Sequence, residues 1–89
     1  MNVVFDKSFS KCIDKIRDQK VKERIIKIII SVEKADSIEK IPQIKKMVGW
    51  SNYYRIKFGD YRLGIELDNN NTIRFIIIAH RKDIYRNFP

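Results

Sequence analysis

Apolar and polar residues alternate along residues 53–68 in two runs that Gly59-Asp60 separates. The apolar positions are Tyr54, Ile56 and Phe58 before this dipeptide and Tyr61, Leu63, Ile65 and Leu67 after it. A period of two predicts strands that each have one apolar face. Glycine in the first position is typical of a two-residue hairpin turn. The pattern therefore predicts a tight β-hairpin around Gly59-Asp60.

The polar face of this hairpin carries several cations. Closing the turn at Gly59-Asp60 sets Lys57 opposite Arg62 and Arg55 opposite Gly64. Like charges that face each other directly across two strands normally destabilise a sheet. We therefore expect these cations to bind an anion, for which phosphate is the obvious candidate.

Two helices are predicted between a short first strand at residues 2–5 and residue 34. The first helix has Asp6 or Ser8 as its cap, and the second follows a break near residues 18–20. Apolar residues recur at helical spacing in both, at Phe9, Cys12, Ile13 and Ile16 and then at Val21, Ile25, Ile28, Ile29 and Val32. Stripes of this kind are buried faces. We expect an antiparallel helical pair that lies on a sheet.

The rest of the chain predicts a connector and a last strand. Pro42 argues against a regular helix in residues 35–49, which we interpret as a connector that becomes extended near residues 44–48. A turn-prone cluster at residues 68–72 leads into a strand at residues 73–79, and its continuously apolar run at 75–78 predicts burial on both faces. The predicted fold class is α+β, with a short N-terminal strand, an antiparallel helical pair and a three-stranded antiparallel sheet.

Length and composition indicate one small domain that spans residues 1–89. A hydrophobic content of 44% is enough for a core. The balance of 19 Lys+Arg against 11 Asp+Glu gives a net charge of +8, which favours a polyanionic partner such as nucleic acid or an acidic protein. Cys12 is the only cysteine, so an intramolecular disulfide is excluded. No apolar run has the length of a signal peptide or a membrane span, and we expect a cytoplasmic protein without a membrane partner.

Two motifs resemble the signature of the RelE/ParE toxin superfamily of bacterial and archaeal toxin–antitoxin systems. They are the run YRIKFGDYRLGIEL, which begins at Tyr54, and the run IRFIIIAHRKDIY, which ends at Tyr85. The usual form in the superfamily is a YRIRxGDYR hairpin with HRxxxY after the last strand. The order of the predicted elements is similar over essentially the whole chain. The resemblance implies a β-α-α-β-β-β toxin fold.

The superfamily has two main activities. RelE-like members cut messenger RNA in the ribosomal A site, whereas ParE-like members inhibit DNA gyrase without cutting RNA. Our leading hypothesis is the first, a metal-independent endoribonuclease without a cofactor. The alternatives are a gyrase inhibitor and an inactive toxin-fold binding protein. The resemblance implies a cognate antitoxin, the ribosome and mRNA as partners.

By motif match, the resemblance implies a catalytic set of Lys57, Arg62, Arg81 and Tyr85. Lys57 or Tyr85 would assist deprotonation of the ribose 2′-hydroxyl. Arg62 would hold the phosphate together with Arg55, and Arg81 would stabilise the leaving group. Arginine keeps its proton at neutral pH, so we expect charge stabilisation from it before proton donation. The chain departs from the archetypal RelE in a shorter interval from Arg81 to Tyr85 and in Arg55, which replaces a lysine.

His80, the only histidine, is assigned to substrate binding together with Arg55. Histidine is the side chain that titrates near neutral pH, so His80 could act as a general acid or base next to Arg81. The favoured alternative is that His80 closes the last strand by a hydrogen bond. Tyr85 also has an alternative role, in which its ring packs on the sheet.

Aromatic residues and further cations lie around the hairpin. Tyr54 alternates with Ile56 and is expected in the core, whereas Trp50 and Tyr53 could stack on bases, as aromatic residues do in proteins that bind single-stranded RNA. The other cations are interpreted as solvated charge or, if functional, as contacts to the ribosomal RNA backbone. They are Lys20, Lys22, Lys27, Lys34, Lys45 and Lys46. No cluster of His, Asp or Glu has metal-ligand spacing, so we expect no metal site.

Overall fold

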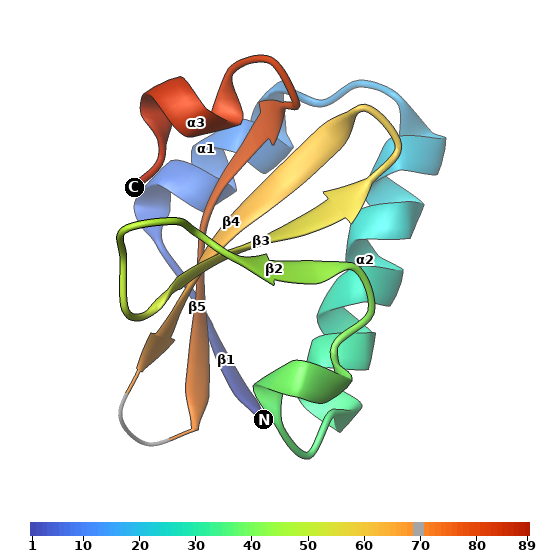
Figure 1. Cartoon of the computed structure of the whole chain (residues 1–89). Coiled ribbons are helices and arrows are strands. Elements are labelled where there is room, and N and C mark those ends of the chain that lie inside the picture. The colour runs from blue at the N-terminus through green and yellow to red at the C-terminus, as the bar shows by residue number, and fades with distance from the viewer. Residues whose placement is uncertain (69–70) are drawn as a thin grey trace.

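The predicted hairpin belongs to a five-stranded sheet in a computed structural model, which describes residues 1–68 and 71–89 (Figure 1). The elements follow in the order β1 (Asn2–Phe5), α1 (Lys7–Lys15), α2 (Gln19–Lys34), the single 3-10 turn η1 (Ile38–Lys40), β2 (Ile44–Lys46), β3 (Tyr53–Phe58), β4 (Tyr61–Asp68), β5 (Thr72–His80) and α3 (Ile84–Asn87). Of the predicted turn cluster at residues 68–72, Asn69 and Asn70 lie outside the described residues.

The strand order across the sheet is β1-β5-β4-β3-β2. β1 runs parallel to β5, and every other neighbouring pair is antiparallel. The predicted three-stranded antiparallel sheet is present as β3, β4 and β5, and β1 and β2 extend it on either side. The extension predicted near residues 44–48 is β2. Its pairing with β3 does not follow from periodicity, because three residues are too few to show an alternation.

The hairpin has the register that the alternation predicts. Lys57 pairs with Arg62, and Arg55 pairs with Gly64. Gly59 adopts a φ of +56°, which is left-handed backbone that glycine enters at no steric cost and that the first position of this turn requires. The turn and the pleat thus place the cations of the hairpin on one face of the sheet.

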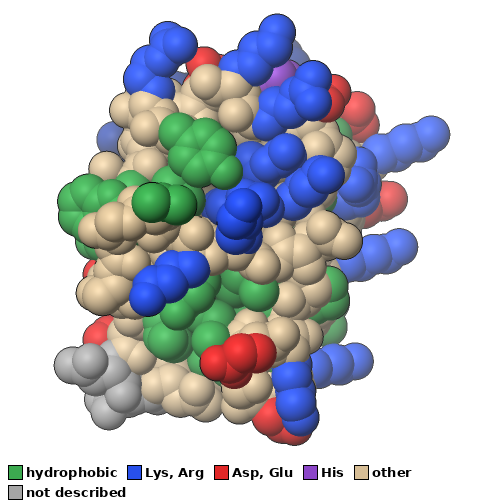
Figure 2. All heavy atoms as spheres, in the orientation of Figure 1, with side chains coloured by type: hydrophobic (Ala, Val, Ile, Leu, Met, Phe, Trp, Pro, Cys, Tyr) green, Lys and Arg blue, Asp and Glu red, His purple; other side chains and the backbone are tan. Residues whose placement is uncertain are grey.

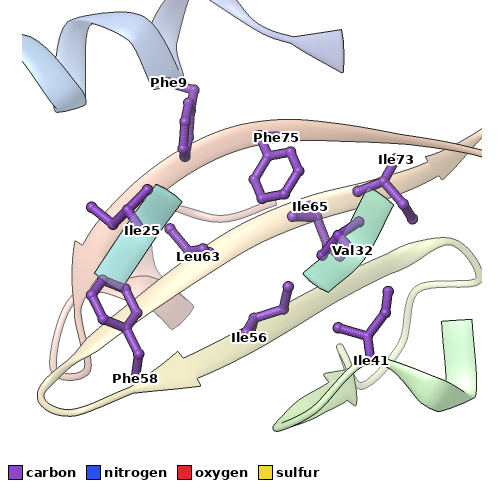
Figure 3. Packing of buried hydrophobic residues seen from close by; sticks show 10 residues of the cluster. All are labelled: Phe9, Ile25, Val32, Ile41, Ile56, Phe58, Leu63, Ile65, Ile73 and Phe75. Atoms are coloured by element: carbon purple, nitrogen blue, oxygen red, sulfur yellow. The ribbon is translucent and has the colours of Figure 1, made fainter. Parts of the chain in front are cut away.

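The other face of the sheet packs against α1 and α2 (Figure 1). Figure 3 shows this core, in which buried side chains of both helices point toward those of the strands. Its buried members are Phe9, Ile25, Val32, Ile41, Ile56, Phe58, Leu63, Ile65, Ile73 and Phe75. The Phe75 ring lies 5.5 Å from that of Phe5 and 5.3 Å from that of Phe9. Both predicted helical stripes therefore face the core, except for Cys12, which is half-buried and does not belong to this cluster. Asp18 caps α2 by accepting a hydrogen bond from the N–H of Lys20 at 2.9 Å.

The face away from α1 and α2, called the outer face below, is covered at one end by the C-terminal segment. Met47, Ile84 and Phe88 form a second buried cluster there, which packs against side chains of β3 and β5. The α3 helix that carries Ile84 is not predicted from periodicity, because a single helical turn shows no repeat. β5 is covered on both faces, as its apolar run predicts.

Gly64 is a point of very close contact between the C-terminal segment and the sheet. A Cβ atom at this residue would lie 2.7 Å from Cγ2 of Ile77 and 2.8 Å from Cγ of Phe88. We expect Gly64→Ala to lower the free energy of unfolding by about 1–3 kcal/mol, because the Phe88 ring must leave a packed position. Urea denaturation measures this loss. Adding Phe88→Leu is expected to recover part of it, and an unchanged unfolding midpoint in Gly64→Ala would contradict the packing.

Candidate phosphate-binding site

Four cations project from neighbouring strands on the outer face. Lys45 pairs with Arg55 across β2 and β3, and Lys57 pairs with Arg62 across β3 and β4. Strand alternation turns all four away from the core residue Ile56. We call Lys45, Arg55, Lys57 and Arg62 the cationic cluster. Figure 2 shows Lys and Arg side chains gathered on the outer face beside hydrophobic ones.

In the part of the chain that the structure describes, no recorded ion pair neutralises the cationic cluster. The ion pairs recorded within residues 1–68 and 71–89 are Lys40–Asp36, Arg74–Glu66 and Arg81–Asp60. None of them includes a member of the cluster. Repulsion between these neighbouring positive charges destabilises the folded protein, and a bound anion would offset this repulsion. A phosphate group fits this need, because its oxygens accept hydrogen bonds from lysine and, in pairs, from the guanidinium fork of arginine.

The hairpin turn holds two of the predicted catalytic arginines. Nη1 of Arg62 donates hydrogen bonds to the carbonyl oxygens of Gly59 at 3.0 Å and Tyr61 at 2.8 Å. The backbone N–H of Arg81 donates to the carbonyl oxygen of Asp60 at 2.8 Å, and the Arg81 Nε lies 3.8 Å from Asp60 Oδ1. The turn thus brings Arg62 of β4 and Arg81, which follows β5, to the same end of the sheet.

Helix α3 brings Tyr85 to the cationic cluster. The Tyr85 hydroxyl accepts a hydrogen bond from Nε of Arg55 at 3.3 Å. The residue is 64% exposed, which contradicts the alternative in which its ring packs on the sheet. Ile84 and Phe88 are buried on either side of it in the sequence and hold the segment in place. Tyr85 is therefore anchored through its neighbours and available to a ligand.

His80 lies apart from the cationic cluster. It pairs with Tyr61, whose ring it meets edge-on at 6.4 Å between centroids, whereas Arg62 pairs with Ala79. Nδ1 of His80 accepts a hydrogen bond from the backbone N–H of Lys82 at 3.2 Å. The ring thus closes the end of β5 by a hydrogen bond, which is the alternative favoured from the sequence.

The aromatic residues before and at the start of the hairpin take different positions. Tyr54 packs against the core, as its alternation predicts. The Trp50 ring meets Tyr53 edge-on, and Tyr53 meets Phe88 in the same way, with 5.5 Å between centroids in each pair. The negative charge of Glu66, followed by burial and a hydrogen bond to Glu66, raises the pKa of the Tyr53 hydroxyl. Tyr53 therefore stays protonated at neutral pH and is not suited to act as a base.

Sequence reasoning misses two residues of the site. Lys45 is interpreted there as solvated charge, because its place opposite Arg55 depends on the pairing of the short strand β2. Asp60 is identified only as a turn residue, because its contact with Arg81 joins segments far apart in the chain. A signal for Lys45 does exist, since Ile44 and Lys45 show the apolar and polar steps of a strand.

The described residues include no helix that is long and apolar enough to cross a membrane. In the same parts of the chain, no group of three or more His, Cys, Asp or Glu side chains could hold a metal ion. Asp60, the carboxylate at the hairpin turn, is paired with Arg81.

Known proteins are similar to this chain over nearly its whole length. Residues 3–85 match the family described as ParE toxin of type II toxin-antitoxin system, parDE. The chain is also 41% identical over 90 residues to Toxin RelE3 of Methanocaldococcus jannaschii, and this match covers 100% of both proteins.

Solved structures agree with these matches. A chain of the RelB-RelE antitoxin-toxin complex from Methanococcus jannaschii is 40% identical, with a TM-score of 0.77 and coverage of 97% of this chain and 99% of that one. A chain of the intact E. coli RelBE toxin-antitoxin complex shares the fold, with 23% identity, a TM-score of 0.70 and coverage of 89% and 94%. The protein therefore belongs to the RelE/ParE superfamily of toxins of type II toxin–antitoxin systems.

Proposed function

We propose that this toxin is an endoribonuclease that cleaves mRNA on the ribosome in the cytoplasm. The observation that carries the proposal is the convergence of the cationic cluster with the Tyr85 hydroxyl on one exposed face. Docking of an acidic protein can use charge that is spread over a surface, whereas phosphoryl transfer needs cations that converge on one group. The name RelE of the 41% identical relative also supports this activity.

The proposed reaction is attack of a ribose 2′-hydroxyl on the adjacent phosphorus. A bond forms between the 2′-oxygen and phosphorus, and the bond from phosphorus to the 5′-oxygen breaks. The 2′ proton passes to a protein group, and the 5′-oxygen takes a proton from solvent water, so the products are a 2′,3′-cyclic phosphate and a 5′-hydroxyl. Negative charge builds up on the phosphorane oxygens, and donors fixed in advance stabilise it best.

Each side chain of the site has a place in this reaction. Arg62 is a prepositioned donor, because backbone carbonyls already hold one nitrogen of its guanidinium. Arg55 adds a second guanidinium and keeps the Tyr85 hydroxyl beside it. Lys57 or Tyr85 accepts the 2′ proton. Arg81, tethered to the hairpin turn, stabilises the charge on the leaving oxygen.

The proposed protein partner is a cognate antitoxin of acidic character. The 40% identical chain from M. jannaschii is part of a RelB-RelE antitoxin-toxin complex. The net charge of +8 favours an acidic partner. An apolar groove of about 360 Å³ between α1 and α2 includes the exposed residues Phe5 and Ile26 in its lining. Exposed apolar surface of this kind is typical of protein interfaces.

Mapping of mRNA 5′ ends after induced expression in bacteria tests the nuclease. We expect new ends within translated codons soon after induction. A matched reporter message without a ribosome-binding site is expected to stay intact, because the proposed activity acts on translated mRNA. Growth arrest with intact messages would refute the proposal.

A gyrase inhibitor is the second candidate, because the family matched over residues 3–85 carries the name ParE. Purified toxin added to gyrase and relaxed plasmid separates the two activities. Blocked supercoiling together with uncut mRNA would establish the second candidate. Normal supercoiling together with cut mRNA would establish the first, and neither effect would leave an inactive toxin fold that binds its partner.

A further inference from the structure

The turn between β2 and β3 exposes an apolar tip next to the cationic cluster. Val48 is 91% exposed and Trp50 is 49% exposed, while Met47 is buried and anchors the turn. The N–H of Trp50 donates to the carbonyl oxygen of Met47 at 3.3 Å, and Gly49 adopts a φ of +85°. A glycine at positive φ in the third position is what a type II turn requires. The backbone therefore fixes Trp50 at the surface.

Ring contacts also hold Trp50 in place. Its ring packs edge-on against Tyr53, which packs edge-on against the buried ring of Phe88. Large aromatic side chains are mostly buried on average, and such edge-to-face pairs stabilise a fixed arrangement. Trp50 thus presents an open surface in an orientation that the two rings set.

A cavity of about 400 Å³ joins this ring to the proposed phosphate site. It is lined by Lys45, Lys46, Met47, Val48, Trp50, Tyr85, Phe88 and Pro89, and we call it the Trp50 cavity. Lys45 is the strand partner of Arg55, and Tyr85 accepts a hydrogen bond from Arg55. One wall of the cavity is therefore shared with the cationic cluster.

We propose that the Trp50 cavity binds an unpaired nucleobase of the RNA whose backbone occupies the cationic cluster. The base stacks on Trp50, and Lys45, which shares the outer face with Arg55, binds the phosphate that adjoins it. Aromatic rings interleaved with cations are how proteins hold single-stranded nucleic acid. The inference rests on the proposed function for the identity of the ligand, and it adds a subsite beyond the reacting phosphate.

The lining predicts little preference for one base over another. Its lining has no amide or carboxylate side chain to read the edge of a base. Lys45 is assigned to the phosphate, and the Tyr85 hydroxyl is bonded to Arg55. Stacking accepts every base, because each has a π-face. We therefore expect the Trp50 cavity to contribute affinity rather than sequence choice.

Intrinsic fluorescence tests the proposal directly, because Trp50 is the only tryptophan in the chain. The probe is a short single-stranded RNA with a 2′-O-methyl group at every position, which blocks attack by the 2′-oxygen, so that binding is measured without cleavage. We expect saturable quenching by this oligonucleotide. An abasic oligonucleotide of equal length and charge is expected to leave the fluorescence unchanged and to bind about 5- to 150-fold more weakly, the loss that corresponds to one stacked base.

Binding of the same labelled oligonucleotides to variants gives a second measurement. Trp50→Ala is expected to lose the same factor for the base-containing strand and nothing for the abasic strand, whereas Trp50→Phe keeps most of the affinity. Ile30→Ala, a matched control at another exposed apolar residue, is expected to bind like the wild type. Equal quenching by both oligonucleotides, or unchanged binding by Trp50→Ala, would overturn the proposal.

The outcomes also separate this inference from the nuclease proposal. Quenching that depends on the base, in a protein that leaves mRNA intact in cells, would support base binding in the Trp50 cavity and refute the nuclease proposal. Cut mRNA with no quenching by either oligonucleotide would support the nuclease proposal and refute base binding in the Trp50 cavity. Quenching by an acidic antitoxin but by no nucleic acid would overturn the subsite and assign the Trp50 cavity to the protein partner.

Discussion

Arg62→Ala is expected to lower the rate of mRNA cleavage about 100- to 1,000-fold, which is the usual cost of removing one fixed donor from a developing oxyanion. The side chain belongs to the cationic cluster and is held by the carbonyl oxygens of Gly59 and Tyr61. These two hydrogen bonds are local, and each contributes on the order of 1 kcal/mol or less to stability. We therefore expect loss of activity in a folded protein. Cleavage on purified ribosomes and thermal unfolding measure the two effects separately.

Two variants control this result. Arg62→Lys keeps the charge but not the fork of donors, so an intermediate loss is expected. Arg74→Ala removes an arginine of β5 that is paired with Glu66 instead of lying in the cationic cluster, and its cleavage rate is expected to stay near that of the wild type. Full activity in Arg62→Ala, or an equal loss in Arg74→Ala, would show that the cluster does not form the phosphate site.

The hairpin was predictable because its information is local. The alternation fixes which side chains share a face, and Gly59 fixes the register through a backbone conformation that few other residues adopt. Pairing of Lys57 with Arg62 follows from these two facts alone. The helical stripes of α1 and α2 are local in the same sense, because each repeats over several turns.

The remaining parts of the site depend on contacts between distant segments. Lys45 joins the cationic cluster only because β2 pairs with β3, and Asp60 meets Arg81 only because the hairpin and the end of β5 adjoin. Neither β2 nor the hairpin turn is long enough to show a periodic pattern from which the segment it contacts could be predicted. His80 shows the opposite situation. It was a candidate because histidine titrates near neutral pH, but the register of β4 and β5 places it beside Tyr61 and away from the cationic cluster.

The outer face combines two neighbouring regions with different physical roles. The apolar cluster of Met47, Ile84 and Phe88 is packed and excludes water, whereas the cationic cluster next to it has no acidic partners in the described parts of the chain. Tyr85 lies at the boundary between the two regions. Its neighbours Ile84 and Phe88 belong to the apolar cluster, and its hydroxyl is hydrogen-bonded to Arg55 of the cationic cluster. Packing at one end of the sheet therefore controls the geometry of the charged site.

Ile84→Ala is expected to undock α3 and to lower cleavage as far as Tyr85→Ala does, on the order of 100-fold. Ile84 is fully buried in the outer cluster, and truncating a buried isoleucine typically costs about 2–5 kcal/mol. A helix of one turn does not form without packing. The amides of Asn87 and Phe88, which donate within this turn, are expected to lose their protection from hydrogen exchange, while those of α2 and β4 keep theirs.

Ile25→Ala is the matched control, because this isoleucine is equally buried but belongs to the core beneath the opposite face. The same truncation there is expected to lower hydrogen-exchange protection throughout the protein, since α2 and the sheet unfold as one unit. Activity in Ile25→Ala then falls with the folded fraction, and a temperature low enough to restore folding restores cleavage. Ile84→Ala is expected to stay impaired at that temperature, because its folded core lacks a positioned Tyr85. Uniform loss of hydrogen-exchange protection in both variants would mean that the packing on the two faces of the sheet unfolds together. Full cleavage by Ile84→Ala would show that Tyr85 is not needed for the reaction.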